Sequence, residues 1–181
     1  MQEFILQKDE EYLQTDVKAF FGMKYISYQT ASIQLKFGYK EFFNQCVKQM
    51  LEDFNGIPCD VITAIPNSKV LTNNTNLFFE AVRQSSSGKY KKIITRIKDS
   101  TTTHPMYGGA VKDQTGVAVA PGYTKQTCTI DKHSIFGKVV LLVDDMYTSY
   151  PMGCYVSRDC IQALLENGAK KVIFYAFASS D

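Results

Sequence analysis

The sequence of 181 residues has no tryptophan, two histidines and no long apolar run. No apolar stretch approaches the ~18–20 residues of a membrane-spanning helix, so we expect no membrane partner. Residues 8–11 are all charged, which is not typical of a secretory signal peptide. Basic and acidic residues nearly balance, at 20 against 18. The net charge of +2 therefore does not favour a nucleic-acid partner, although it leaves one open.

The two histidines, His104 and His133, give little support to a hydrolase of the Ser-His-Asp kind. On an α/β fold such an enzyme holds its serine in a Gly-x-Ser-x-Gly turn, and the sequence has none. The Gly-x-Gly-x-x-Gly of dinucleotide-binding proteins and the Walker lysine loop are also missing. These absences disfavour three common kinds of α/β site.

Cysteines are few and follow no ligand pattern. Five occur, with no Cys-x-x-Cys pair, at positions 46, 59, 128, 154 and 160. An odd number without such a pair favours neither a disulfide framework nor a zinc finger. Reduced thiols in a cytoplasmic protein are the simpler interpretation, and we predict no metal-ligand set in the chain.

Hydrophobic periodicity predicts helices that alternate with short buried strands. Apolar residues recur at helical spacing over Tyr39–Phe54, and Gly56 and Pro58 end that helix. Further helices are predicted at 77–82 and 153–166, and strands at 60–66, 91–98, 138–143 and 171–178. This alternation predicts an α/β fold, with an open, mainly parallel sheet and helices on both faces. Ligands of such sheets bind at the carboxyl ends of the strands.

One long stretch, Asp99–Thr127, has no sustained period and is rich in threonine, glycine and proline. An irregular stretch of about 30 residues inside a compact domain is usually a functional loop. We predict that it forms a lid over the site or a binding loop, and an enzyme would use it as the lid.

Two acids, Asp144 and Asp145, follow a wholly apolar run in the segment 139–152, "VVLLVDDMYTSYPM". Carboxylates at a strand end accept hydrogen bonds from a vicinal diol. A turn that leads into a helix offers N–H groups and a favourable dipole to a phosphate, and Thr148 and Ser149 add hydroxyl donors. The segment is therefore suited to a ribose phosphate. The alternative is that the two acids only cap the following helix.

This segment resembles the phosphoribosyl pyrophosphate (PRPP) motif of type I phosphoribosyltransferases, in which two acids and Thr-Thr-Gly follow an apolar strand. The resemblance implies that Asp144 and Asp145 contact the ribose hydroxyls of PRPP and are the catalytic residues. It also implies that the next residues wrap the 5′-phosphate, namely Met146, Tyr147, Thr148, Ser149, Tyr150, Pro151 and Met152.

Two upstream segments extend the resemblance over most of 35–178. "DVITAIPNSK" is similar to the strand and pyrophosphate loop of the same family, which places Asn67, Ser68 and Lys69 in that loop. "LKFGYKEFFNQCVKQML" is similar to the start of the phosphoribosyltransferase domain in ComF-like competence proteins. The Arg-Gly-Phe-Asn signature of the ComF-like group is absent from the matching stretch, 73–82.

The resemblance implies a phosphoribosyltransferase domain over 35–181, with 1–34 as an N-terminal segment that belongs to a hood or a sheet edge. The expected reaction transfers the phosphoribosyl group of PRPP to a nitrogen nucleophile and releases pyrophosphate. The implied cofactor is Mg²⁺ chelated by the substrate, and a homodimer is an open expectation. The sequence does not name the acceptor.

Departures from the family motif keep a second interpretation open. Tyr150 stands where the family has glycine, Met152 stands where it has threonine, and Pro151 removes one N–H donor from the phosphate loop. The second interpretation is a non-catalytic module that binds a phosphoribosyl ligand or nucleotide, either regulatory or a ComF-like accessory in DNA uptake or processing. Arg96 and Lys98 either face the same site or are edge-strand charges.

Overall fold

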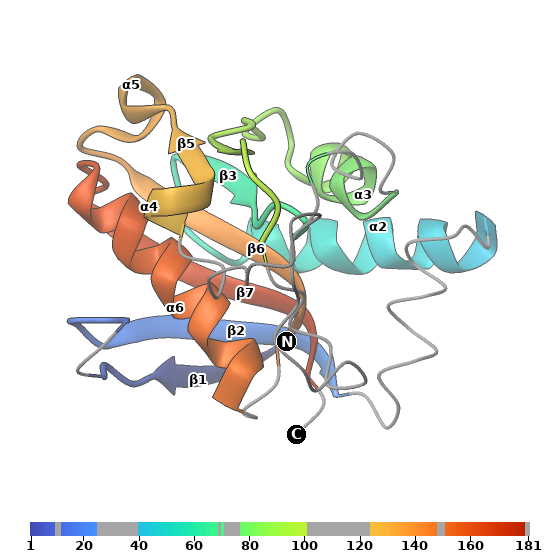
Figure 1. Cartoon of the computed structure of the whole chain (residues 1–181). Helices are drawn as coiled ribbons and strands as arrows, with labels where there is room; N and C mark the ends of the chain where they lie inside the picture. Colours follow the sequence, from blue (N-terminus) through green and yellow to red (C-terminus); the bar gives the residue numbers. More distant parts are fainter. Residues whose placement is uncertain are drawn as a thin grey trace.

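The computed structural model describes residues 1–9, 12–24, 40–68, 70, 77–100, 124–147 and 151–179. It has a five-stranded sheet in the order β1-β2-β7-β6-β3 and a two-stranded sheet of β4 and β5 (Figure 1). The strands are β1 (Gln2–Leu6), β2 (Val17–Lys24), β3 (Val61–Ala64), β4 (Ile94–Arg96), β5 (Cys128–Ile130), β6 (Val139–Tyr147) and β7 (Lys171–Ser179). The helices are α2 (Lys40–Asn55), α3 (Leu77–Ser85), α4 (Thr124–Thr127), α5 (Lys132–Ile135) and α6 (Pro151–Glu166).

The main sheet is parallel except at one edge. The pairs β3–β6, β6–β7 and β7–β2 are parallel, and β1 pairs with β2 in the antiparallel sense. Parallel neighbours need a crossover connection, and α6 supplies it between β6 and β7. The prediction of an open, mainly parallel α/β sheet is confirmed.

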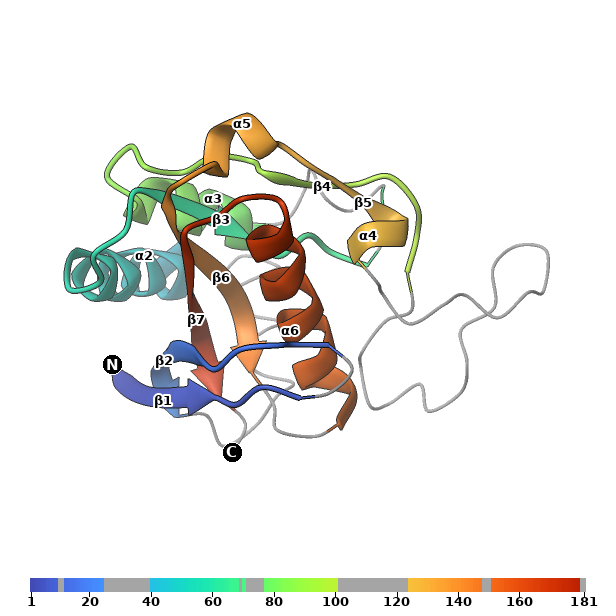
Figure 2. The same cartoon turned by 90° about the vertical axis from the view of Figure 1, so that its left-hand side faces the viewer.

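Helices cover both faces of this sheet, as predicted (Figure 2). Side chains of a strand alternate between faces, so β6 contributes to two cores. Val140 and Leu142 pack on the α6 face, whereas Leu141 and Val143 pack on the face covered by α2 and α3. The wholly apolar strand of the sequence is therefore a strand buried on both sides.

The strand predicted at 91–98 is the main error in the sheet. The structure has a shorter strand, β4, which pairs with β5 in the antiparallel sense rather than joining the parallel sheet. The chain just before β4 contacts the main sheet through an isolated parallel bridge between Tyr90 and Ile62. The apolar pattern located a buried segment, but it could not show that the partner strand lies about 30 residues further along the chain.

The amino-terminal hairpin of β1 and β2 was not foreseen, because segment 1–34 shows no regular pattern. Aspartate side chains stabilise the long charged connection between β1 and β2. The Asp16 carboxylate, for example, accepts a hydrogen bond from the Lys8 backbone N–H at 2.8 Å. An ion pair of 3.1 Å between Asp9 and Arg158 ties the connection to α6. The hairpin thus joins the sheet beside β7 and is also fastened to a helix on one face.

A buried polar contact fixes the α2 face of the sheet. The Tyr175 hydroxyl donates to one carboxylate oxygen of Asp53 at 2.7 Å, and the Gln49 amide donates to the other at 3.1 Å. Asp53 is only 6% exposed, so both bonds offset the cost of burying its carboxylate. The backbone of Gly22 lies directly over this pair, and a β-carbon at that position would overlap the Tyr175 hydroxyl.

Four cysteine side chains are described, and all four are buried free thiols. Burial raises the pKa of Cys46 to about 12, so this thiol is protonated and unreactive at neutral pH. Within the part of the chain that the structure describes, no helix is long and apolar enough to cross a membrane.

Candidate functional site

The acid pair lies within β6, near its carboxyl end. The strand continues to Tyr147, so the prediction that it ends at Val143 was wrong. The β3–β6 ladder stops where Ala64 pairs with Val143, while the β6–β7 ladder continues. One neighbouring strand is enough to extend β6 past its apolar run. Asp144 therefore stands at the first position of β6 beyond the β3 ladder.

Asp144 faces the α6 side of the sheet. Its carboxylate accepts from the backbone N–H of Asp145 at 2.9 Å, and the Ser157 hydroxyl on α6 donates to its other oxygen at 3.5 Å. The helix begins at Pro151, several residues after the two acids. The alternative that the acids stand at the helix N-cap is therefore wrong, because they are strand residues.

The chain leaving β3 runs beside the acid pair. The backbone N–H of Ile65 donates to the carbonyl of Val143 at 2.9 Å, one residue before Asp144. The next residues along the chain after Pro66 are Asn67 and Ser68, which are half-buried. The loop after β3 therefore begins beside the acid pair of β6, so two segments that the sequence singled out separately are neighbours in the structure.

The segment after β4 holds this loop in place. The backbone N–H of Ser100 donates to the Ser68 carbonyl at 2.8 Å, and the Asp99 carboxylate accepts from the Val70 N–H at 2.9 Å. The Arg96 guanidinium donates to the Asn67 carbonyl at 3.0 Å. The root of the long irregular stretch is thus bonded to the loop after β3.

Arg96 is the residue whose role the sequence could not decide. It is 5% exposed, and its second bond joins it to the Thr127 hydroxyl at 2.5 Å. Lys98, by contrast, is an exposed residue. Arg96 therefore bridges the loop after β3 and α4. The sequence signal for this bridging role was an arginine inside an apolar strand, just before a long irregular stretch.

Replacing Arg96 by methionine is expected to loosen the loop after β3 while the sheet stays folded. The change removes two hydrogen bonds from a charged group, each worth about 1.5–3 kcal/mol, but keeps the buried stem. Amide hydrogen exchange at Ser100 should then quicken at least tenfold. The matched control is Lys98→Met, which should leave that exchange unchanged. Equal exchange in the wild type and the Arg96 variant would contradict the bridging role.

The structure describes only part of the predicted phosphate-binding segment. Met146 is 9% exposed and packs in the α2-side core, so its side chain is not available to a ligand. Lys69, Thr148, Ser149 and Tyr150 lie outside the described residues, as do the side chains of Pro151 and Met152. The predicted lid lies outside them at 101–123, a range that includes His104.

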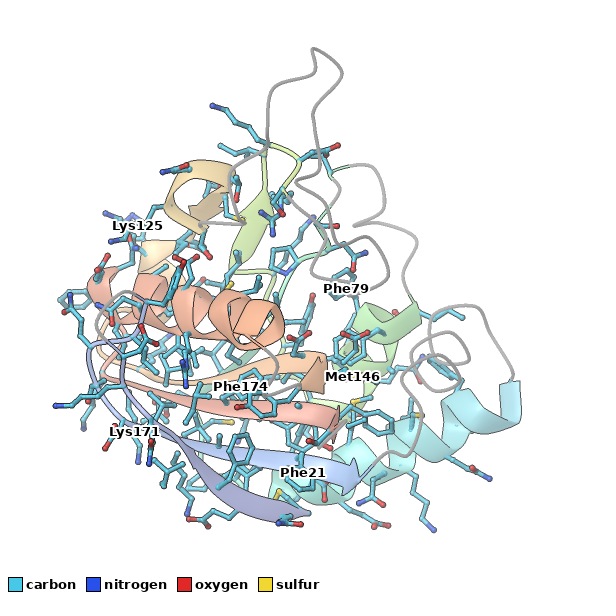
Figure 3. All side chains as sticks on the ribbon, turned by 60° about the horizontal axis from the view of Figure 1, so that its bottom comes forward. Phe21, Phe79, Lys125, Met146, Lys171 and Phe174 are labelled. Carbon is cyan, nitrogen blue, oxygen red and sulfur yellow. The ribbon has the colours of Figure 1, made fainter. Side chains whose placement is uncertain are left out.

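A cluster of aromatic rings beside the acid pair was not predicted. The Tyr147 ring lies 5.0 Å from that of Phe4 and 6.2 Å from that of Phe174, between ring centroids. Phe21 lies 5.9 Å from Phe4 on the same hairpin. Figure 3 shows Phe21 and Phe174 on neighbouring strands, with Met146 at the end of β6. The hairpin thus brings half-buried rings to the face on which Asp144 lies.

Among the described residues, no group of three or more His, Cys, Asp and Glu side chains is placed to hold a metal ion. Mg²⁺ in proteins is commonly bound through one or two carboxylates together with substrate phosphates, so a substrate-borne ion needs no such group. The acid pair and the adjacent loop are compatible with that kind of ion.

Comparisons with known proteins give a distant structural likeness. No family model matches the chain, and no curated protein sequence matches it. Two similar solved structures are described as the allosteric regulatory enzyme of purine biosynthesis and as glutamine PRPP amidotransferase from B. subtilis complexed with ADP and GMP. Each has 17% identity and a TM-score of 0.43 over 73% of this chain. The chain spans 24% and 25% of those two chains, and this likeness is too low to assign a family.

Proposed function

We propose that the protein binds PRPP and transfers its phosphoribosyl group to a nitrogen nucleophile, releasing pyrophosphate. The observation that carries this proposal is the hydrogen bond between Ile65 and Val143. It brings the segment that resembles a pyrophosphate loop next to the segment that resembles a PRPP motif. Both lie at the carboxyl ends of parallel strands, where ligands of open α/β sheets bind.

The acid pair would bind the ribose. Asp144 and Asp145 present carboxylate oxygens, which accept hydrogen bonds from the two ring hydroxyls of PRPP. As the bond to pyrophosphate breaks, positive charge develops on the ribose ring. Negative carboxylates held near the ring favour that charge, and they are most effective where water is excluded.

The loop after β3 would hold the departing pyrophosphate. Asn67, Ser68 and Lys69 are its proposed ligands, with Lys69 supplying a positive charge. Arg96 acts as a positioning residue through its bond to the Asn67 carbonyl. Mg²⁺ chelated by the substrate would neutralise further charge on the pyrophosphate.

The turn from β6 into α6 would hold the 5′-phosphate, chiefly through backbone N–H groups over 146–152. Pro151 is the first residue of α6, where its missing N–H breaks no bond within the helix. The turn therefore accommodates proline, with one donor fewer for the phosphate.

The amino-terminal segment 1–34 would form the edge of the site rather than a separate unit. Its hairpin carries Phe4, whose ring lies against Tyr147 at the end of β6 and against Phe21 on β2. The buried thiols agree with the reducing cytoplasm that we propose as the location. A homodimer is also proposed, on the resemblance alone.

A binding module without catalysis is the second candidate, and the sequence of the phosphate turn favours it. Tyr150 stands where the resembled family has glycine, and Pro151 has no N–H to donate to a phosphate. Such a module would sense a phosphoribosyl ligand or nucleotide. A ComF-like accessory role in DNA uptake or processing is one form of it.

Pyrophosphate release separates the two candidates. The full chain is incubated with PRPP, Mg²⁺ and a panel of purine and pyrimidine bases, and pyrophosphate is measured. An enzyme should release pyrophosphate with one base or a few related ones, and Asp145→Asn should abolish the release. Binding of PRPP with no release for any base would favour the module. Neither binding nor release would contradict both.

A further inference from the structure

A cavity lies beside the carboxyl end of β3, on the edge of that strand that does not pair with β6. It has a volume of about 200 Å³ and lies between β3, α3 and the chain that leads into β4. Its lining residues are Thr63, Ala64, Pro66, Phe79, Tyr90, Lys92 and Ile94. Phe79 stands in the first turn of α3 (Figure 3).

The lining of this cavity does not include the acid pair on β6, although it includes Pro66, which directly precedes the loop of Asn67 and Ser68. Ala64, Phe79 and Tyr90 belong to the core on the α2 and α3 face of the sheet, whereas Ile94 belongs to the core on the α6 face. Asp144 meets α6 on the opposite face, through Ser157. A ligand in the cavity would therefore not occupy the ribose site.

The lining combines an apolar floor with the polar groups of Tyr90 and Lys92, while the Thr63 hydroxyl already accepts from the Ile93 backbone N–H at 3.3 Å. Ala64, Pro66 and Ile94 are buried and provide the floor, and the Phe79 ring offers a half-buried aromatic wall. Among the described residues, neither the Tyr90 hydroxyl nor the Lys92 ammonium group has a hydrogen-bond or ion-pair partner. Both residues line the cavity.

These two groups favour an anion. Burial raises the pKa of Tyr90, so its hydroxyl is protonated at neutral pH and can donate a hydrogen bond. Lys92 carries three N–H donors and a positive charge on an exposed side chain. Hydrogen bonds from such donors to a carboxylate are stronger than bonds between neutral groups.

The size of the cavity limits the ligand to a single ring. An engineered cavity of about 150 Å³ holds one benzene molecule. Pockets for drug-sized ligands have volumes of about 300–1,000 Å³. The present volume of about 200 Å³ therefore suits one ring with one small substituent, and not a nucleoside.

We propose that this cavity binds a small planar anion, namely a monocyclic aromatic or heteroaromatic carboxylate. The ring lies against Phe79 and the apolar floor, and the carboxylate accepts hydrogen bonds from Tyr90 and Lys92. This site goes beyond the proposed function, because it needs neither PRPP nor the acid pair.

Benzoate is the probe for this site, and the full chain is titrated with it by calorimetry and by ligand-observed NMR. A ligand of this size should bind with a Kd of about 1 mM. Lys92→Met should weaken binding at least fivefold, and Tyr90→Phe about threefold. The matched control is Lys91→Met, an exposed neighbour that does not line the cavity, and it should bind as the wild type does. Benzamide, which has the same shape without the charge, should bind at least fivefold more weakly than benzoate.

Two results would overturn the proposal: no saturation with benzoate up to about 20 mM, or equal weakening by the Lys91 and Lys92 substitutions. The Asp144→Asn/Asp145→Asn variant should bind benzoate normally, whatever it does to PRPP. Failure of the PRPP proposal therefore leaves this one standing, and the reverse also holds.

Discussion

Replacing Asp144 and Asp145 together by asparagine is expected to weaken PRPP binding by about 100-fold or more. Asparagine keeps the shape of each side chain. At position 144 its one carbonyl oxygen can still accept from the backbone N–H at 145, and its NH2 group can donate to the Ser157 hydroxyl oxygen instead of accepting from it. Asparagine loses the charge that strengthens hydrogen bonds to the ribose hydroxyls. Two charge-assisted bonds are worth about 1.5–3 kcal/mol each, or roughly 10²–10⁴-fold in affinity together. Calorimetry with PRPP and Mg²⁺ measures the change.

The control for this variant is Glu52→Gln, which removes a carboxylate from an exposed position of α2. It should leave both PRPP affinity and the melting temperature unchanged. The double variant should also melt within a few degrees of the wild type, since the acids lie at the end of β6 rather than in the core. Unchanged PRPP affinity in the double variant would show that the ligand site lies elsewhere. Loss of secondary structure would instead indicate that the acids serve the fold.

Gly22→Ala is expected to cause the largest loss of stability among single methyl additions considered for this chain. The new β-carbon would overlap the Tyr175 hydroxyl and lie 3.0 Å from a carboxylate oxygen of Asp53. Overpacking costs about 1–3 kcal/mol, and loss of the buried bond between Tyr175 and Asp53 adds about 1.5–3 kcal/mol. The expected sum lowers the melting temperature by about 10 °C for a chain of this size. Thermal unfolding followed by circular dichroism measures it.

A double-mutant cycle tests whether the loss of stability in Gly22→Ala comes from the overlap with the Tyr175 hydroxyl. In the Tyr175→Phe background the nearest atom to the new methyl group is gone, so Gly22→Ala should cost less than half of its cost in the wild type. The control is Gly56→Ala, where the closest atom to a β-carbon is 3.4 Å away. Additive costs would mean that the overlap with Tyr175 is not what fixes glycine at position 22.

Long periodic segments were the predictable part of the fold. The helix predicted at Tyr39–Phe54 is α2, shifted by one residue, because its apolar stripe recurs with a single period. The strand predicted at 171–178 is β7, and Gly168 ends the preceding helix with a φ of 101°, as the predicted Asn-Gly stop requires. Each of these depends on local sequence alone.

Features set by distant partners were not predictable. The carboxyl end of β6 depends on β7, which continues after β3 has stopped, so the polar residues at 144 and 145 remain in the strand. The hairpin of β1 and β2 depends on pairing with β7, nearly 150 residues later in the chain. Its connection has no two-residue turn signal, because aspartate side chains satisfy the backbone instead.

In the candidate site, too, the features set by local sequence were predictable and those set by distant partners were not. The acid pair stands out because two charges follow five apolar residues, which is visible locally. The role of Arg96 was not decided, because its partners Asn67 and Thr127 are far from it in the sequence, on either side. The aromatic cluster was missed for the same reason, since its rings come from β1, β2, β6 and β7.

The central claim is that this chain binds PRPP at the carboxyl ends of β3 and β6. The most direct test is calorimetric titration of the full chain with PRPP, with and without Mg²⁺. The account predicts saturable binding at one site per chain, with a Kd of about 1–100 μM that weakens when Mg²⁺ is removed. No measurable binding at about 1 mM PRPP, with or without Mg²⁺, would contradict it.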